Sequence, residues 1–143
     1  MPAMKPKEFL ELLPDLLRQQ LPPEFADFQI AHRGASLTKM SYDRLAVHYE
    51  VHIQKKKKEV EIGLHFESDP ATNFQYLELM SQRSKDIKAS LGAGIEVEEW
   101  VRGWPRVHAP IALDPLDDDF LVELSFRLSA MIQTLEPILR GEA

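Results

Sequence analysis

Histidines and glutamates alternate with apolar residues along one stretch, VHYEVHIQKKKKEVEIGLHFES, which covers residues 47–68. His48, His52 and His65 all fall at polar positions of this alternating pattern. Imidazole nitrogens and carboxylate oxygens are the usual ligands of zinc and of several other divalent ions. The residue types therefore point to metal-binding chemistry, provided that the fold brings these side chains together.

The alternation itself predicts the local structure. Apolar residues occupy every second position over residues 44–54 and again over 59–67, which indicates two half-buried strands of an antiparallel hairpin. The register follows because core residues must face core residues. The expected core pairs are Ile53 with Val60, Val51 with Ile62, Tyr49 with Leu64 and Val47 with Phe66.

The same register arranges the polar face of the hairpin. It places His48 opposite His65 and His52 opposite Glu61. Directly opposed residues have Cβ atoms about 4.5–5.5 Å apart, so two imidazoles can reach one ion. We therefore derive a candidate site for zinc or another divalent metal from His48, His65, His52 and Glu61. The alternative is that no cofactor binds and these residues form an ordinary solvated face.

Four consecutive lysines separate the two strands: Lys55, Lys56, Lys57 and Lys58. In the expected register Lys55 faces Lys58, and Lys56 and Lys57 form the tip of the turn. A lysine run can contact phosphates, but sheets that bind nucleic acid usually add exposed aromatic side chains, and this polar face has none. The pattern therefore favours a solvated turn over a nucleic-acid site.

The elements that must hold this hairpin follow from the rest of the chain. A helix is expected over about residues 5–21, with a kink or a restart at Pro14, and then a short strand, FQIAHRG, and a polar loop. After the hairpin, a helix is expected from Pro70 to Gly92, then two strands around RGWP, and a last apolar helix.

The order helix, three strands, helix, two strands, helix predicts an α+β fold. We expect a two-layer sandwich in which helices cover one face of an antiparallel sheet of about five strands. Residues 1–143 are expected to form a single domain, with the sheet and later helices over 25–141.

Composition narrows the class of protein. The formal net charge of −6 argues against a surface built as a whole to neutralise phosphates. The absence of cysteine excludes disulfides, thiolate zinc sites and a cysteine nucleophile. No apolar leader and no run of about 20 apolar residues is present, so we expect a cytoplasmic bacterial protein without a membrane segment.

Enzymatic motifs are missing from the sequence. There is no G-x-S-x-G, no phosphate-binding glycine loop and no recognisable pair of catalytic carboxylates. Trp100, Arg102 and Trp104 either line a binding groove or anchor the end of the sheet. These features favour a non-enzymatic protein.

The last helix carries more apolar surface than one helix face needs. Phe120, Phe126, Ile132 and Leu139 require cover, either from the first helix or from another subunit. Large apolar patches mark association surfaces, and two-fold dimers are the commonest assemblies. These four residues are therefore the expected surface for a homodimer or for another protein partner.

Residues from Val47 to about Leu139 resemble an uncharacterised bacterial domain family, found alone or appended to nuclease-like modules of DNA-defence loci. The resemblance lies in VHYEVHI, VEIGLHF, Asn73, IKASLG, VEEWVRGWPRV and LEPIL. It implies a fold and a genomic setting, and it assigns no catalytic residue. The element order is also similar to that of the small acidic dimeric chaperones of type III secretion, which would imply an effector binder.

Together these patterns predict a non-enzymatic regulatory or protein-binding accessory protein that forms a homodimer. Two alternatives stay open. One is a metal-dependent or nucleic-acid-associated accessory protein that uses the polar face of the 44–67 hairpin, and the other is a secretion-chaperone-like effector binder.

Overall fold

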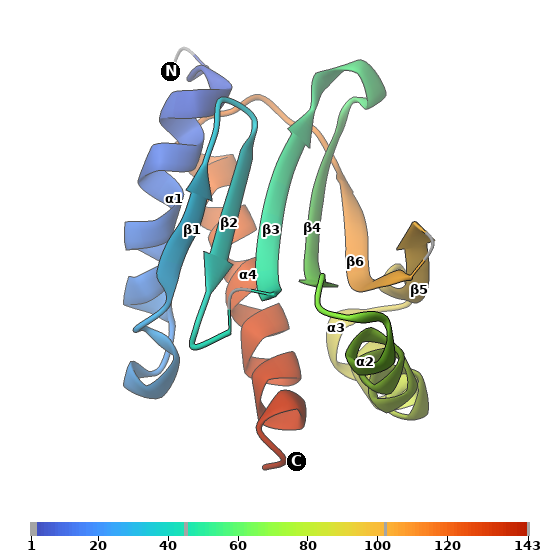
Figure 1. The fold of residues 1–143 in the computed structure, drawn as a ribbon. Helices are drawn as coiled ribbons and strands as arrows, with labels where there is room; N and C mark the ends of the chain where they lie inside the picture. Colours follow the sequence, from blue (N-terminus) through green and yellow to red (C-terminus); the bar gives the residue numbers. More distant parts are fainter. Residues whose placement is uncertain (1–2, 45, 102, 143) are drawn as a thin grey trace.

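The computed structural model describes residues 3–44, 46–101 and 103–142. They form a six-stranded antiparallel sheet with helices packed against it (Figure 1). The elements are α1 (Pro6–Gln20), η1 (Pro23–Phe25), β1 (Gln29–Arg33), β2 (Leu37–Ser41), β3 (Val47–Gln54), η2 (Lys55–Lys57), β4 (Glu59–Phe66), α2 (Pro70–Gln82), α3 (Ser84–Leu91), β5 (Glu96–Val101), β6 (Trp104–Ala112) and α4 (Asp118–Leu139). The α+β class and the antiparallel sheet predicted from the sequence are confirmed.

The sheet has one strand more than predicted. Its order is β1-β2-β3-β4-β6-β5, and β2 lies in the segment that the sequence indicated as a polar loop. Thr38 and Ser41 suggested solvent exposure, yet both are buried beside Met40 because β2 lies between β1 and β3. Polar composition was therefore a misleading guide to the position of this strand.

The helices differ from the prediction in two places. Of the two outcomes expected at Pro14, a restart does not occur, because α1 is one continuous helix, and Pro14 is buried with Leu13 and Leu17. Packing of this face offsets the hydrogen bond that a proline removes. The helix expected from Pro70 to Gly92 is divided at Arg83 into α2 and α3, because the Arg83 backbone leaves helical geometry at φ −102° and ψ 6°.

The predicted hairpin register is confirmed at every pair. β3 and β4 are antiparallel, and the core pairs run from Ile53–Val60 to Val47–Phe66. On its other side β4 pairs with β6, which places Gly63 beside His108. The hairpin therefore forms the centre of the sheet.

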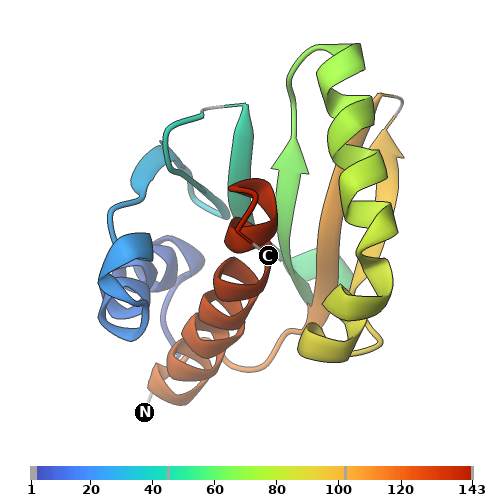
Figure 2. The same ribbon diagram turned by 90° about the horizontal axis from the view of Figure 1, so that it is seen from below.

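The helices share one hydrophobic core with one face of the sheet. Figure 1 shows α4 behind the strands, and in Figure 2 α4 lies between α1 and the α2–α3 pair. Tyr49, Leu64 and Phe66 from the hairpin are buried against this layer with Leu124 and Leu128 of α4. Each such side chain contributes about 1.5–3 kcal/mol on burial. Among the described residues, no helix is long and apolar enough to span a membrane.

Asn73 fixes the corner where β4 passes into α2. Its side chain accepts a hydrogen bond from the Ser68 backbone N–H at 2.8 Å and donates to the Gly103 carbonyl at 2.8 Å. Asp69 caps α2 by accepting from the Thr72 N–H at 2.9 Å. These bonds hold the end of β4, and with it Glu67, in a defined position.

Candidate metal centre

The face of the sheet opposite α4, here called the polar face, carries the predicted histidines. Strand alternation sends Tyr49 of β3 into the core and its neighbours His48 and Glu50 to the polar face. The register then pairs His48 with His65 of β4 and Glu50 with Lys39 of β2. Three adjacent strands thus contribute to one group of charged and polar side chains.

Glu50 lies between the two paired histidines. Its Oε1 is 3.0 Å from Nε2 of His48, and its Oε2 is 3.0 Å from Nε2 of His65. The two imidazole rings stack with centroids 5.9 Å apart and planes 7° from parallel. One carboxylate therefore binds both rings.

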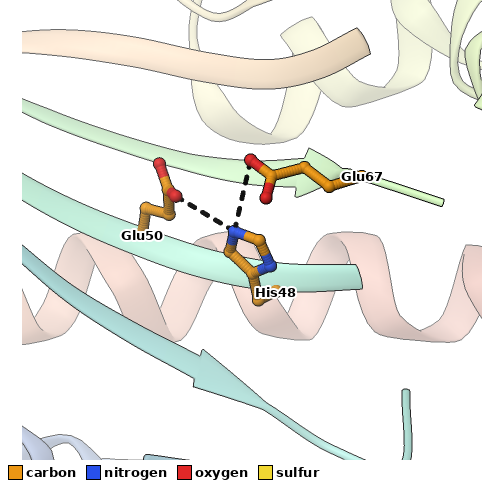
Figure 3. A group of neighbouring side chains, drawn as sticks. All are labelled: His48, Glu50 and Glu67. Atoms are coloured by element: carbon orange, nitrogen blue, oxygen red, sulfur yellow. Dashed lines mark hydrogen bonds and ion pairs between the residues drawn. The ribbon is translucent and has the colours of Figure 1, made fainter. Parts of the chain in front are cut away.

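Two further charged groups, Glu67 and Lys39, lie beside these residues, and Figure 3 shows Glu67. Oε2 of Glu67 is 3.8 Å from Nε2 of His48, so this imidazole lies between two carboxylates. Nζ of Lys39 is 3.4 Å from Oε1 of Glu50 and 3.9 Å from Oε1 of Glu67. We refer to His48, Glu50, His65 and Glu67 as the His48 cluster, with Lys39 as its neighbouring cation.

Three of the four residues of the His48 cluster are buried although they belong to the polar face, and the Glu67 side chain is 18% exposed. His48 and His65 are each 3% exposed, and Glu50 is 8% exposed. Buried polar groups are stable only when they are paired, and a buried charge needs a partner of opposite sign. The cluster is thus an organised network of mutually bonded groups and not the solvated face that the alternative interpretation described.

The environment of Glu50 favours its ionised form. Burial by itself raises the pKa of this carboxyl group, but hydrogen bonds and positive charge from His48 and His65 outweigh that effect. The result is a pKa far below the ordinary value of 4.5. A permanently charged carboxylate is available beside two imidazole nitrogens.

This arrangement has the composition of a metal site. Single donor atoms of His48, Glu50 and Glu67 all lie within 4.8 Å of one another. Donors bound to one zinc ion at about 2.0–2.2 Å are about 3.3 Å apart, so small side-chain movements bring these three atoms into range. Nitrogen and oxygen donors suit zinc, manganese, iron, cobalt and nickel.

The structure changes the predicted ligand set. His48 and His65 meet as expected, but His52 and Glu61 lie outside this group. His52 contacts Gln54, with its Nδ1 3.3 Å from Nε2 of the amide. Glu61 faces His108 of β6 and not a metal-binding partner on β3. Cross-strand pairing alone could not predict the contacts of His52 and Glu61, because each side chain contacts a residue other than its register partner.

Glu61 belongs instead to a second ion-pair group on the same face. His108 contacts Glu61 through Nδ1 and Oε1 of Glu98 through Nε2, the latter at 2.6 Å. Arg106 lies 3.3 Å from Oε1 of Glu98 and 3.8 Å from Oε1 of Glu61. Burial raises the pKa of Glu98, but His108 and Arg106 lower it by more, so the net shift is downward. Both carboxylates have partners within the group, which makes it a structural network.

Gly63 allows the two groups to share one face. It pairs with Glu50 on one side and with His108 on the other. A Cβ atom at this position would lie 2.8 Å from Cβ of His108 and 3.0 Å from the Val107 carbonyl oxygen. Glycine is therefore required for the close approach of β4 and β6.

The expected partner surface is mostly internal. Phe120 and Ile132 are buried, and the Phe120 ring stacks on Phe9 of α1 with centroids 5.8 Å apart. Leu139 packs partly against the core, and only Phe126 of the four is largely exposed, at 60%. The first helix, one of the two covers considered for this surface, therefore covers Phe120.

The remaining predicted site residues have separate locations. Lys55–Lys57 form η2, and the left-handed Lys58 closes the turn with its N–H bonded to the Lys55 carbonyl. Trp104 is 43% exposed at the start of β6. The Trp100 side chain and Arg102 lie outside the described residues, so the predicted groove of these three residues stays a prediction.

Comparison of the chain with protein-family models, curated proteins and solved structures finds no match.

Proposed function

We propose that the protein is a non-enzymatic accessory protein that binds a divalent transition-metal ion through His48, Glu50 and Glu67. The observation that carries this proposal is the convergence of three donor atoms within 4.8 Å, two of them from buried side chains and one from the partly exposed Glu67. Two carboxylates and one imidazole supply a charge of −2 against the +2 charge of the ion. That balance offsets the cost of burying each carboxylate.

His65 supports the proposed ligands by orienting one of them. It holds Oε2 of Glu50 at 3.0 Å while Oε1 points to His48. Residues that orient a ligand in this way commonly change metal affinity by about 10–100-fold when they are replaced. In this arrangement His65 is a positioning residue, and a water molecule can fill the fourth coordination position.

Lys39 supplies positive charge to the same carboxylates and therefore competes with a metal ion. Its side chain is 27% exposed, so the ammonium group can turn toward solvent. A divalent ion would then take the place of the Lys39 ammonium group beside Glu50 and Glu67, so that a charge of +2 replaces a charge of +1. Removal of the Lys39 charge is expected to strengthen metal binding by this mechanism.

The ion would join β3 to the end of β4. Because the folded chain arranges the ligands and the unfolded chain does not, binding stabilises the fold by about 2.7 kcal/mol when free metal is 100 times Kd. Metal affinity should decrease as the pH is lowered, because an imidazole must be neutral to bind a metal. A metal-dependent change in the rigidity of the central hairpin is the property that an accessory protein could use.

Thermal unfolding with and without Zn²⁺, Mn²⁺ or Ni²⁺ tests the proposal. At least one ion should raise the wild-type midpoint by several degrees, because about 1 kcal/mol corresponds to about 2–8 °C in a domain of this size. The shift should disappear in Glu67→Gln and increase in Lys39→Met. Equal shifts in wild type and Glu67→Gln, or no shift with any of the three ions, would exclude the site.

Protein association is a second candidate function, supported by one observation on α4. Phe126 is 60% exposed and Val122, one turn earlier on the same helix, is 41% exposed. Such a pair suits a homodimer or a protein partner that covers the outer surface of α4.

The solution mass tests this second function. Light scattering coupled to size-exclusion chromatography should give twice the chain mass of 16.4 kDa for the wild type. The variant Phe126→Ser should give the chain mass while it unfolds at the wild-type temperature. A wild type that elutes as a monomer at every concentration tested would remove the homodimer.

A further inference from the structure

Five lysines from two distant segments of the sequence surround one hollow. A groove of about 760 Å³ lies between the start of α1, the β1–β2 turn and η2. Its lysines are Lys5 and Lys7 from α1 and its flank, and Lys55, Lys56 and Lys57 from η2. No acidic residue is among the described residues that line it. The fold therefore joins the lysine run to a second basic segment about 50 residues earlier in the chain.

These lysines have not been neutralised by neighbouring carboxylates. All five are exposed, and within the described chain none lies within ion-pair distance of an acidic side chain. The rest of the protein is acidic, with a formal net charge of −6. Like charges repel, so five positive charges around one hollow favour the binding of an anion there.

The basic path continues beyond this groove. A second hollow of about 250 Å³ shares Lys7 and Ala35 with the first and adds Arg33 of β1. Its acidic lining residue among those described is Glu11. An elongated anion can therefore extend from η2 past the start of α1 toward β1.

The lining indicates what kind of anion fits. Lysine is a common phosphate ligand that acts as a point charge, and the groove presents five of them without an arginine among its described residues. No aromatic side chain is among the described lining residues, so contacts to phosphates and not stacking on bases would carry the binding. A hollow of this volume has the size of a small-ligand pocket, which suits a few linked nucleotides better than the broad outer surface of a duplex.

We infer that this lysine groove binds the phosphate backbone of single-stranded nucleic acid without selecting bases. The sequence alone favoured a solvated lysine turn because the polar face of the hairpin has no exposed aromatic side chain. Lys5 and Lys7 are the observation that changes this interpretation. The inference is independent of the proposed metal centre, which lies on the polar face.

Salt dependence gives the inference a quantitative form. Each lysine that neutralises a phosphate of a single strand contributes about −0.7 to the slope of log K against log salt concentration. Five lysines thus predict a slope of about −3.5 and a loss of about a hundredfold in affinity between 50 and 200 mM salt. Each pair of lysines removed should reduce the slope by about 1.4.

Fluorescence anisotropy with a labelled 20-nucleotide oligothymidylate provides the test. The wild-type chain is compared with Lys5→Gln/Lys7→Gln and with Lys56→Gln/Lys57→Gln. The matched control is Lys85→Gln/Lys88→Gln, which removes the same charge from exposed positions on α3. Thermal unfolding of every variant verifies that it is folded.

The expected result is weaker binding and a slope near −2.1 in both groove variants, with wild-type binding in the control. Wild-type binding by Lys5→Gln/Lys7→Gln would show that the two segments do not form one site. An equal loss of affinity in the control would show that the effect comes from the net charge of the protein and not from the groove. No binding at 50 mM salt, or binding of polyglutamate in preference to the oligonucleotide, would overturn the inference.

Discussion

Tyr49 and Glu50 are neighbours on β3, yet they belong to two opposite chemical environments. Glu50 enters the His48 cluster on the polar face, whereas Tyr49 enters the core and donates a hydrogen bond to Oε1 of Glu136 at 3.0 Å. Both carboxyl groups are buried, with 8% of Glu50 and 5% of Glu136 exposed. Their pKa values nevertheless shift in opposite directions.

The partners of each carboxyl group explain the difference. Glu50 contacts two imidazoles, with Lys39 close by, and these outweigh its burial. At Glu136, burial raises the pKa by more than the hydrogen bonds from Tyr49 and Arg140 lower it. The Tyr49 phenol is neutral, and Arg140, 3.0 Å away at Nε, is 34% exposed and screened by water. Burial alone therefore does not determine the charge state, and the polar face is the environment suited to a cation.

The largest expected effect comes from Glu50→Gln. The substitution removes the negative charge that contacts both His48 and His65, and loss of one partner from a buried charged group costs about 3 kcal/mol. Urea unfolding at pH 7 measures this cost. A loss no larger than that of an exposed substitution would show that the cluster adds little to the fold.

Gly63→Ala should have the next largest effect. Its Cβ would lie 2.8 Å from Cβ of His108, so β4 and β6 must separate, at a cost of about 2 kcal/mol. Gly94→Ala is the matched control, since nothing lies within 4 Å of a Cβ there. The same urea experiment applies. Equal stability of the two variants would contradict the tight contact between the strands.

Glu136→Gln should cost less than Glu50→Gln, at about 1 kcal/mol or below at pH 7. The amide oxygen can still accept the Tyr49 hydrogen bond, and the raised pKa means that the carboxylate charge is poorly stabilised where it lies. Chemical unfolding of both Gln variants under the same conditions gives the comparison. A larger loss for Glu136→Gln would reverse the proposed contrast.

The dependence on pH should differ in sign between the two sites. Ionised Glu50 stabilises the fold above its ordinary pKa of 4.5, and this contribution is lost as pH falls below that value. For Glu136, stability is fully present below 4.5 and is lost as pH rises through the raised pKa. Each contribution changes by at most about 1.4 kcal/mol per pH unit.

Urea titrations of the wild type and both Gln variants between pH 3.5 and 7 measure these slopes. The difference in free energy of unfolding between the wild type and Glu50→Gln should become smaller as the pH falls below 4.5. The free energy of unfolding of the wild type should decrease relative to that of Glu136→Gln as the pH rises above 4.5. Parallel curves for the two variants would mean that the two carboxyl groups share one type of environment.

The sequence predicted the centre of this molecule better than its periphery. Strict alternation in residues 44–67 determined the hairpin register, and with it the contact of His48 with His65. Alternation could not indicate that β4 also pairs with β6, because that pairing joins segments separated by α2 and α3. His108 was therefore missed, and Glu61 was assigned to the wrong group.

Two kinds of information were absent from the pattern. The first is the direction in which each side chain points on its face of the sheet. This direction brings Glu50 and Glu67, and not His52, next to His48. Long-range packing decides that Lys5 and Lys7 approach η2. Local periodicity reports which face a residue occupies, and only the tertiary structure reports its neighbours on that face.

Calorimetric titration of the chain with Zn²⁺ at pH 7.5 tests whether the His48 cluster is a metal centre. We expect one saturable site per chain, retained in His52→Asn and lost in Glu67→Gln, because Glu67 is a proposed ligand and His52 is bonded to Gln54 outside the cluster. Absence of saturable binding in the wild type, or equal binding in both variants, would contradict the assignment of the His48 cluster as a metal centre.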